Sequence, residues 1–211
     1  MPHKDEVSEC FALAPKIGYE AWGIAGPLVS ILGLAQWGDF NLVRRRALES
    51  GLRRCTEVYG PTFPTTSVAE AQHAAKDIAM LFDVARILDS PLVVITGNKR
   101  VEGGLEATIS GLETLLPLIE DSPVKLAIEP HYKSQIQFLE DYDTIFDRIQ
   151  SPQVGITLDS GHFHAAGVDW RLVIERYQDR IYNFQVKDHI GTQSVRIGAG
   201  EVDLKGYIEA L

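Results

Sequence analysis

The chain has few cysteines and no long apolar run, which are the features that mark disulfide-rich and membrane-spanning proteins. Only two of its 211 residues are cysteines, Cys10 and Cys55. This excludes a disulfide framework and predicts free thiols in a reducing compartment. No stretch approaches ~20 consecutive apolar residues, so no membrane span is expected. The polar first ten residues, MPHKDEVSEC, are unlike a secretory signal. We therefore expect a cytoplasmic protein with no membrane partner.

Positive charge is also scarce. The chain has 20 Lys and Arg against 29 Asp and Glu, a formal net charge of −9. A field of this sign repels a phosphate backbone, so we expect no nucleic-acid partner. The basic runs Arg44–Arg46 and Arg53–Arg54 are local, and we interpret them as a solvated face. No glycine-rich phosphate loop follows an early strand, which removes the usual support for a nucleotide-binding sheet.

Short apolar, β-branched runs alternate with helical patterns along the chain. A run such as PLVVITG at 91–97 is apolar throughout, which is typical of a parallel strand covered on both faces. Six strands are predicted in this way, at 21–24, 55–59, 92–96, 125–129, 154–158 and 182–187. Each is followed by a helix or a helical stretch, and successive units span roughly 30 residues, a normal length for a strand–helix unit.

The helices are predicted from apolar residues spaced three and four apart. The clearest pattern covers 67–88, where Ser67 followed by Glu70 has the form of a capping box. Asp169 is expected to cap a helix to 177, and another helix is expected after Asp203. The remaining predicted helices lie at 104–120 and 138–149, with weaker signals before Gly18 and from 42 onward.

Repeated strand–helix units form either a (β/α)8 barrel or an open doubly wound sheet. Without a phosphate loop, the barrel is favoured. A complete barrel has eight strands and this chain shows six. We therefore predict an α/β fold, a single domain over 1–211, that is a (β/α)8 TIM barrel incomplete at both ends.

Polar residues collect where three successive strands end. These ends carry Glu129 and His131, then Asp159 and His162, then Gln185 with Lys187 and His189 just beyond it. The carboxyl ends of barrel strands meet at one mouth, where chemistry is located. A carboxylate facing a barrel interior is costly unless it is paired or bound to a cation. Two carboxylates and an amide oxygen suit Mg²⁺ or Mn²⁺, and a nearby imidazole shifts the preference toward Co²⁺ or Zn²⁺.

Each of these residues also has an ordinary explanation when taken alone. A glutamate at a strand end is more often a helix cap or an ion-pair partner than a ligand. His73 and His164 are interpreted as incidental, and His189 is weighed as a loop residue. The coincidence on three strands is what raises Glu129, Asp159 and His162 above these alternatives.

The segments LAIEPH, GITLDSGHFHAAG and YNFQVKDHIGTQSVRIGAGEVDLKGYIEAL resemble the xylose isomerase-like TIM barrels. The resemblance runs from KIGYEAWGI to the end of the chain and is strongest over 124–208. It implies a divalent metal held at strand ends, with Glu129, Asp159 and Gln185 as the first three ligands. It also implies that His162 contacts the substrate.

Two departures from the family pattern stand out. The third ligand is usually the histidine of a His-x-Lys-Asp segment, and here the segment begins with Gln185. Hydroxypyruvate isomerase-like members also have glutamine there. The fourth ligand is a glutamate on the last strand, which also acts as acid or base, and this chain stops at Leu211 before such a strand. We therefore expect weak metal binding and little turnover from these 211 residues alone.

The resemblance implies an isomerase or epimerase of a sugar or a hydroxy-keto acid. In this chemistry a carboxylate takes a proton from the carbon next to a carbonyl, and an enediolate forms. Glu129 would be both ligand and catalytic acid/base, and His131, Lys187, His189 and Arg196 would line the substrate side. The sequence does not decide between isomerase and epimerase activity, and it does not identify the metal or the substrate. Whether the chain forms a homo-oligomer also stays open. The alternatives are a degenerate barrel that binds a sugar or forms oligomers and, less favoured, a zinc-dependent abasic-site endonuclease.

Overall fold

The computed structural model describes residues 6–25, 39–64 and 66–211. Its parallel strands alternate with helices along most of the chain. The elements are α1 (Glu6–Ile17), β1 (Ala21–Ala25), α3 (Phe40–Glu49), β2 (Arg54–Phe63), α4 (Val68–Leu88), β3 (Leu92–Gly97), α5 (Gly104–Ile119), β4 (Lys125–Glu129), α6 (Leu139–Arg148), β5 (Val154–Asp159), α7 (Ser160–Ala165), α8 (Trp170–Tyr177), a 3-10 turn (Gln178–Arg180), β6 (Ile181–Gln185), β7 (Asp188–Ile190), β8 (Gln193–Val195) and α9 (Leu204–Glu209).

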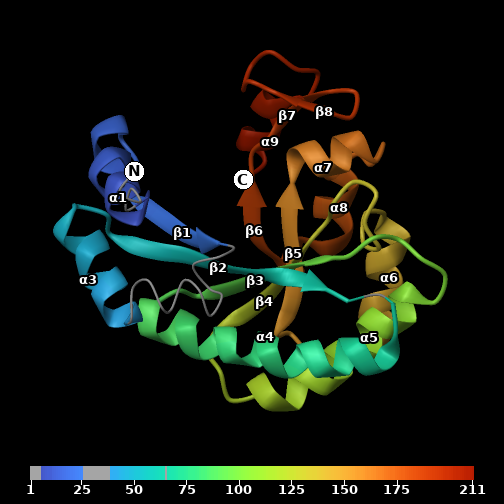
Figure 1. The fold of residues 1–211 in the computed structure, drawn as a ribbon. Helices are drawn as coiled ribbons and strands as arrows, with labels where there is room; N and C mark the ends of the chain where they lie inside the picture. The colour runs from blue at the N-terminus through green and yellow to red at the C-terminus, as the bar shows by residue number, and fades with distance from the viewer. Residues whose placement is uncertain (1–5, 26–38, 65) are drawn as a thin grey trace, which may run out of the picture.

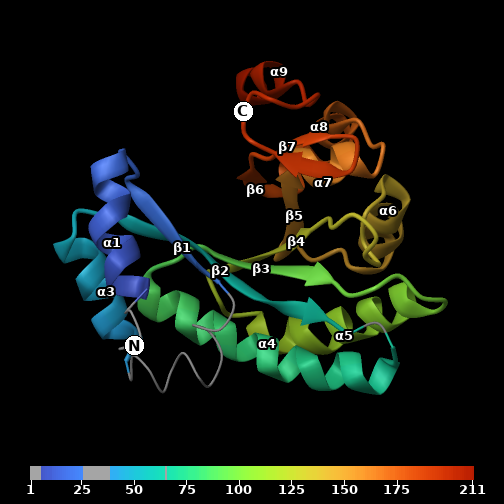
Figure 2. The ribbon, with the colours of Figure 1, turned by 45° about the horizontal axis from the view of Figure 1, so that its top comes forward.

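Six strands form one parallel sheet in the order β1-β2-β3-β4-β5-β6. The sheet curves into half a barrel, and helices lie on its outer face, with α4 and α5 side by side (Figures 1 and 2). Within the described ranges, β1 and β6 each pair with only one strand of this sheet. The prediction of a TIM-barrel-like α/β fold with six parallel strands is confirmed.

The two faces of the strands have different surroundings. Ile95, Ile128 and Leu158 are fully or almost fully buried in the main core beneath the helices, with relative exposures of 1%, 0% and 0%. Leu92, Val94 and Ala127 form a separate small cluster. It follows from strand alternation that this cluster faces the barrel interior. Side chains two residues further along the same strands, including Glu129, therefore point to the mouth of the barrel.

Most of the predicted helix ends are confirmed. The Ser67 hydroxyl accepts a hydrogen bond from the Glu70 backbone N–H over 3.2 Å, and Asp169 and Asp203 cap α8 and α9. The predicted capping box is only half formed, because the Glu70 carboxylate accepts a hydrogen bond from Thr66. The exposed Thr66 hydroxyl is within reach of that carboxylate and takes the place of the reciprocal bond.

The chain between β6 and α9 differs from the prediction. The sixth strand ends at Gln185, and the next residues form a small antiparallel hairpin, β7 and β8, instead of leading directly to a helix. The short helix α7 was also not predicted. Each of these elements spans three to six residues, which is too short for hydrophobic periodicity to reveal.

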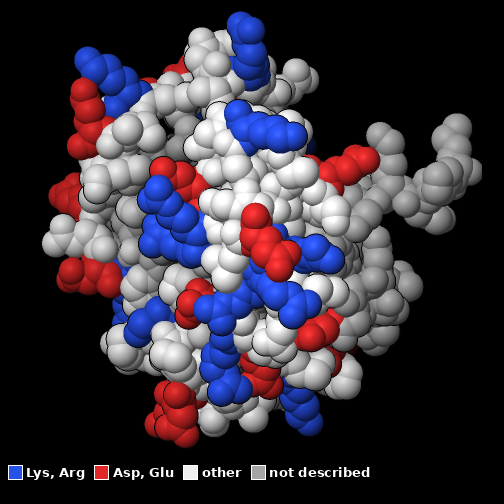
Figure 3. All heavy atoms as spheres, turned by 90° about the vertical axis from the view of Figure 1, so that its left-hand side faces the viewer, with Lys and Arg blue, Asp and Glu red and all other residues white. Residues whose placement is uncertain are grey.

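The basic runs lie on an exposed face over α3 and the start of β2. Figure 3 views this side of the molecule and shows acidic side chains interspersed with the basic ones. Arg44 pairs with Asp89 over 2.8 Å, and Arg53 pairs with Glu20 over 3.1 Å. The face therefore has charges of both signs. Among the described helices, none is long and apolar enough to cross a membrane.

Candidate metal and acid/base site

The ends of β4, β5 and β6 bring three predicted site residues together. The side chains of Glu129 and Asp159 are almost completely buried, with exposures of 1% and 0%. The Gln185 amide lies against both, with one of its two polar atoms 3.0 Å from Glu129 Oε1 and 3.0 Å from Asp159 Oδ2. Residues from three successive strands thus form a cluster of oxygen-bearing groups, as the strand-end pattern predicted.

Lys187 lies over this cluster and joins its two carboxylates. Its Nζ atom is 2.8 Å from Asp159 Oδ2 and 3.2 Å from Glu129 Oε1. Burial raises the pKa of Asp159, and the ammonium offsets part of that rise. Burial alone would lower the pKa of Lys187, but the two carboxylates raise it. The ammonium therefore supplies positive charge between two buried acids.

The two carboxylate oxygens of Glu129 have different surroundings. Oε1 is contacted by His131 Nε2 and by Lys187 Nζ, each over 3.2 Å. Oε2 is buried and has no hydrogen-bond partner among the described residues. Burial would raise the pKa of Glu129, but hydrogen bonds from His131 and Tyr59 and the charge of Lys187 lower it to about 2. Glu129 is therefore ionised at neutral pH and keeps one oxygen available.

His162 is held in a defined orientation at the start of α7. Asp159 caps this helix, and its Oδ1 accepts a hydrogen bond from the His162 backbone N–H over 2.7 Å. His162 Nδ1 accepts one from the Tyr132 backbone N–H over 3.3 Å. Burial, with the charges of Lys187 and His131, lowers the pKa of His162 to about 3. The ring is thus neutral at pH 7, and its proton is on Nε2, because Nδ1 is the acceptor.

Two sets of donors meet at Glu129. Glu129, His131 and His162 have ligand atoms within 4.8 Å of one another, and the two imidazole rings stack with centroids 4.0 Å apart. The second set is made of the carboxylates of Glu129 and Asp159, with the Gln185 amide beside them. The residues fit a divalent cation, since the unpartnered Oε2 of Glu129 is a buried anionic donor that water does not reach.

The segment after β6 packs directly against α7. A Cβ atom at Gly161 would lie 2.2 Å from His189 Nδ1 and 2.7 Å from the Lys187 Cβ, so only glycine fits there. The Asp188 carboxylate accepts hydrogen bonds from the backbone N–H groups of the 198–202 loop. This packing fixes the backbone from which Lys187 reaches the carboxylates.

The predicted residues at the edge of the site have different surroundings. His189 is buried, its ring centroid is 6.3 Å from that of His162, and its Nδ1 has no partner in the described part of the chain. Arg196 is exposed beyond β8, and no described contact joins it to the cluster. His164 pairs with Glu201 over 3.5 Å. The substrate-binding roles given to His189 and Arg196 stay predictions.

Sequence reasoning missed three polar residues of the barrel interior. Tyr59 places its hydroxyl 3.3 Å from His131 Nε2. Asn183 Nδ2 donates to Glu57 Oε2 over 2.6 Å, from β6 to β2. Burial raises the pKa of Glu57, and the hydrogen bond from the Asn183 amide opposes that rise. A sequence signal exists for two of them, since Glu57 and Tyr59 are two residues apart in a predicted strand and therefore point to the same face of the sheet.

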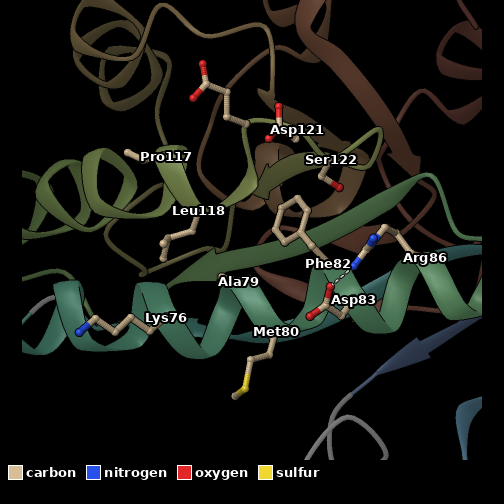
Figure 4. Close-up of a pocket in the computed structure, with 11 residues that line it drawn as sticks. Lys76, Ala79, Met80, Phe82, Asp83, Arg86, Pro117, Leu118, Asp121 and Ser122 are labelled. Carbon is tan, nitrogen blue, oxygen red and sulfur yellow. Dashed lines mark hydrogen bonds and ion pairs between the residues drawn. The ribbon is translucent and has the colours of Figure 1, made fainter.

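A groove lies elsewhere on the molecule, on the outer helical layer between α4 and α5 (Figure 4). Its lining combines the exposed Met80 and Leu118 with the charges of Asp83 and Arg86, which pair with each other. No cluster of three metal-ligating side chains is found there among the described residues. The strand-end cluster is therefore the candidate site.

Similar solved structures share the fold at low sequence identity. The chain matches a zinc-bound crystal structure of the IOLI protein with 17% identity and a TM-score of 0.78, covering 98% of this chain and 78% of that one. It matches the apo 3-keto-D-glucoside 4-epimerase YcjR of E. coli with 16% identity and a TM-score of 0.79, covering 97% and 81%. It matches a D-tagatose 3-epimerase-like protein with 21% identity and a TM-score of 0.73, covering 92% and 78%.

The sequence comparisons give one family. No curated protein sequence matches the chain. The pattern of one protein family does match, over residues 11–211, which is nearly the whole sequence. Together with the six-stranded half-barrel, this establishes that the chain belongs to the xylose isomerase-like TIM barrel family.

Proposed function

We propose that this chain is a metal-dependent isomerase or epimerase that removes a proton next to a carbonyl of a sugar or hydroxy-keto acid. The observation that carries the proposal is Glu129. It is an ionised, buried carboxylate at a strand end with one oxygen left without a partner. Neighbouring residues supply further oxygen donors and a neutral imidazole. The family and the epimerases among the solved structures of the same fold support this class of reaction.

The oxygens of Glu129, Asp159 and Gln185 are the proposed ligands. His162 is less suited, because its Nδ1 already accepts the Tyr132 N–H and its Nε2 therefore carries the proton. Three oxygen donors favour Mn²⁺ or Mg²⁺, with Co²⁺ or Zn²⁺ as alternatives. The zinc in the IOLI protein structure belongs to that protein. When bound, the cation supplies Lewis-acid polarisation of a substrate carbonyl.

The chain's own residues have distinct tasks in this proposal. Glu129 is ionised and can accept the proton. His162 is neutral and can donate its Nε2–H to a substrate oxygen, and it lies 4.0 Å from Glu129 Oε1. Lys187 and His131 hold the carboxylate in place and remain candidates for contacts with the substrate. A single carboxylate can remove a proton and return it to the same face, so we expect proton exchange to be easier to detect than net conversion.

The test is proton exchange in D₂O. The protein with Mn²⁺ is incubated with hydroxypyruvate, D-fructose and D-tagatose separately, and NMR measures deuterium at the carbon next to the carbonyl. We expect incorporation from at least one compound, and its loss in Glu129→Gln and with EDTA. Glu113→Gln, which changes an exposed carboxylate on α5, is the matched control. No incorporation from any compound, or equal incorporation by Glu129→Gln, would contradict the proposal.

One observation favours a second candidate, a sugar-binding barrel without a metal. Lys187 already contacts both carboxylates, so the cluster is partly neutralised by the chain itself. In this case a sugar would bind to the hydrogen-bonding groups of the mouth, and Mn²⁺ would have no effect. Calorimetry with each compound, with and without Mn²⁺, separates the two. Sugar binding that is identical in EDTA would favour the second candidate.

A further inference from the structure

The Nδ1 atom of His162 faces a hydrogen-bond donor. The donor is the Tyr132 backbone N–H, in the loop that follows β4, and the distance is 3.3 Å. A neutral imidazole has one protonated and one unprotonated nitrogen, so an Nδ1 acceptor requires the proton to be on Nε2. Nε2 lies 4.0 Å from Glu129 Oε1. His162 therefore presents an N–H, and no lone pair, to the carboxylates.

A tight turn aims the Tyr132 N–H at the ring. The turn covers 131–134 and is closed by the Ser134 N–H, which donates to the His131 carbonyl over 2.9 Å. That carbonyl and the Tyr132 N–H belong to the same peptide group, which is trans. In a trans peptide the C=O and N–H bonds point in opposite directions. The hydrogen bond that turns the carbonyl inward therefore turns the N–H outward, toward His162.

The turn is held in an unusual backbone conformation. Its third residue, Lys133, has a φ of 67°, in the left-handed region that glycine adopts more readily. The Lys133 N–H donates to Oε1 of the buried Gln137 over 2.9 Å. The His131 N–H donates to the Ile136 carbonyl over 3.0 Å. Backbone strain of this kind persists only where the surrounding contacts impose it, so the orientation of the donor is built into the loop.

This arrangement is the reverse of what a metal-binding histidine needs. Such a histidine typically donates the N–H of one nitrogen to a carboxylate, a carbonyl or water, and binds the metal through the other. For His162 Nε2 to bind a cation, Nδ1 would carry the proton and face the Tyr132 N–H, donor against donor. Glu129, His131 and His162 otherwise have ligand atoms within 4.8 Å of one another. The Tyr132 N–H therefore opposes a binding mode that the positions of the side chains allow.

We propose that the Tyr132 main-chain N–H makes the site selective among divalent cations, because it keeps His162 out of the coordination sphere. The inference rests on the proposed function, since it concerns the same cation. Oxygen donors favour Mn²⁺ or Mg²⁺, whereas an added imidazole nitrogen shifts the preference toward Zn²⁺. Tyr132 acts through His162 and is a positioning residue. The ring is left to donate its Nε2–H to a substrate oxygen.

The first experiment compares the wild type with Tyr132→Pro on the full chain. Proline lacks the N–H and is favoured at the second position of a turn whose third residue has a positive φ. Calorimetry measures the Zn²⁺ and Mn²⁺ affinities of each protein. We expect the ratio of the two to shift toward Zn²⁺ by about tenfold or more in Tyr132→Pro. In a His162→Phe background, which keeps a ring without nitrogen atoms, Tyr132→Pro should leave the ratio unchanged.

A second turn of the same kind provides the matched control. It covers 101–104, where the Gly104 N–H donates to the Val101 carbonyl over 3.1 Å and the third residue, Gly103, has a φ of 72°. Glu102 is the exposed second residue of that turn. Glu102→Pro therefore places a proline at the equivalent position without touching the donor to His162. Its ratio of Zn²⁺ to Mn²⁺ affinity should match that of the wild type.

NMR of the isotope-labelled wild type in EDTA tests the hydrogen bond itself. We expect a scalar coupling across the bond between the Tyr132 amide nitrogen and His162 Nδ1, and ring-nitrogen shifts that place the proton on Nε2. The Nε2–H should persist when Mg²⁺ is added. A proton on Nδ1 in the metal-free wild type would overturn the inference, whatever the protein does to a sugar.

The outcomes separate this inference from the proposed function. An unchanged ratio in Tyr132→Pro, or an equal shift with and without the His162 imidazole, would overturn the selectivity role and leave the metal site standing. No binding of either cation by the wild type would overturn the proposed metal site and the selectivity role with it. If Tyr132→Pro does not fold, as judged by circular dichroism, the wild-type NMR spectrum with Zn²⁺ decides. Retention of the Nε2–H with Zn²⁺ bound supports the inference, and its replacement by a bond from Nε2 to Zn²⁺ overturns it.

Discussion

Lys187 and a divalent cation compete for the same two carboxylates. The Lys187 ammonium is 2.8 Å from Asp159 Oδ2 and 3.2 Å from Glu129 Oε1. A cation bound to these oxygens must displace it or bind against its charge. We predict that Lys187→Met, which keeps the length of the side chain and removes the charge, tightens Mn²⁺ binding and destabilises the metal-free protein.

The size of the effect follows from the burial of the partners. Removal of one member of a buried ion pair costs ~3–5 kcal/mol. The Lys187 side chain is 34% exposed, so solvent screening reduces this to about 2 kcal/mol. In the wild type the ion pairs of Lys187 stabilise the metal-free protein by this amount, and Mn²⁺ must overcome that stabilisation to bind. The variant lacks these ion pairs, so they do not oppose Mn²⁺ binding there. The expected gain in affinity is therefore ~30-fold, since ~1.4 kcal/mol is a factor of ten.

Calorimetry and thermal denaturation check both halves of this prediction. In EDTA the melting temperature of Lys187→Met should fall by about 4–8 °C, and Mn²⁺ should restore most of it. Lys205→Met, which removes the same charge from a side chain that is 85% exposed, should match the wild type. Weaker or unchanged Mn²⁺ affinity in Lys187→Met would refute the argument that the ammonium occupies the cation's place.

Three further predictions concern stability. The pKa of Glu129 is lowered to about 2 in the folded chain, so its contribution to the free energy of unfolding is complete above the unfolded pKa of ~4.3 and is lost as pH falls through the folded value. Urea denaturation in EDTA from pH 6 to 3 should show a declining free energy of unfolding, and Glu129→Gln should flatten this decline. An equal slope in both proteins would contradict the prediction. Tyr207→Phe removes a buried hydroxyl that donates to two backbone carbonyls, and urea denaturation should show that the free energy of unfolding falls by ~1–3 kcal/mol. An unchanged free energy of unfolding would contradict the docking of α9 through this hydroxyl. Asp141→Ala leaves Arg100 without its two 2.9 Å contacts. Because the Arg100 side chain is 41% exposed, the free energy of unfolding should fall by about 2 kcal/mol in the same assay, and a fall below ~1 kcal/mol would show that this pair adds little.

The positions of β3, β4 and β5 could be predicted because each of these strands is mostly apolar and buried. The run at 92–96 is buried from Leu92 to Gly97, and its boundaries follow from the sequence. The strand-end cluster could be predicted for the same reason. Once the ends of β4 and β5 were placed, Glu129 and Asp159 had to share one edge of the sheet, and the structure gives both as buried.

The details of the site could not be read from strand positions. The place of the Lys187 ammonium depends on a flexible side chain and on the close packing at Gly161. The β7–β8 hairpin has strands of three residues, which show no period. The hydrogen bond between Glu57 and Asn183 joins residues 126 positions apart in sequence, which only the curvature of the sheet brings together.

Anomalous diffraction from crystals of the protein soaked in Mn²⁺ tests the central claim most directly. The account predicts one strong peak within bonding distance of Glu129 Oε2, Asp159 and the Gln185 amide oxygen, with Lys187 moved away from the carboxylates. A peak bound by the imidazoles of His131 and His162 instead, or no peak at the strand ends while Lys187 keeps both of its contacts, would contradict it.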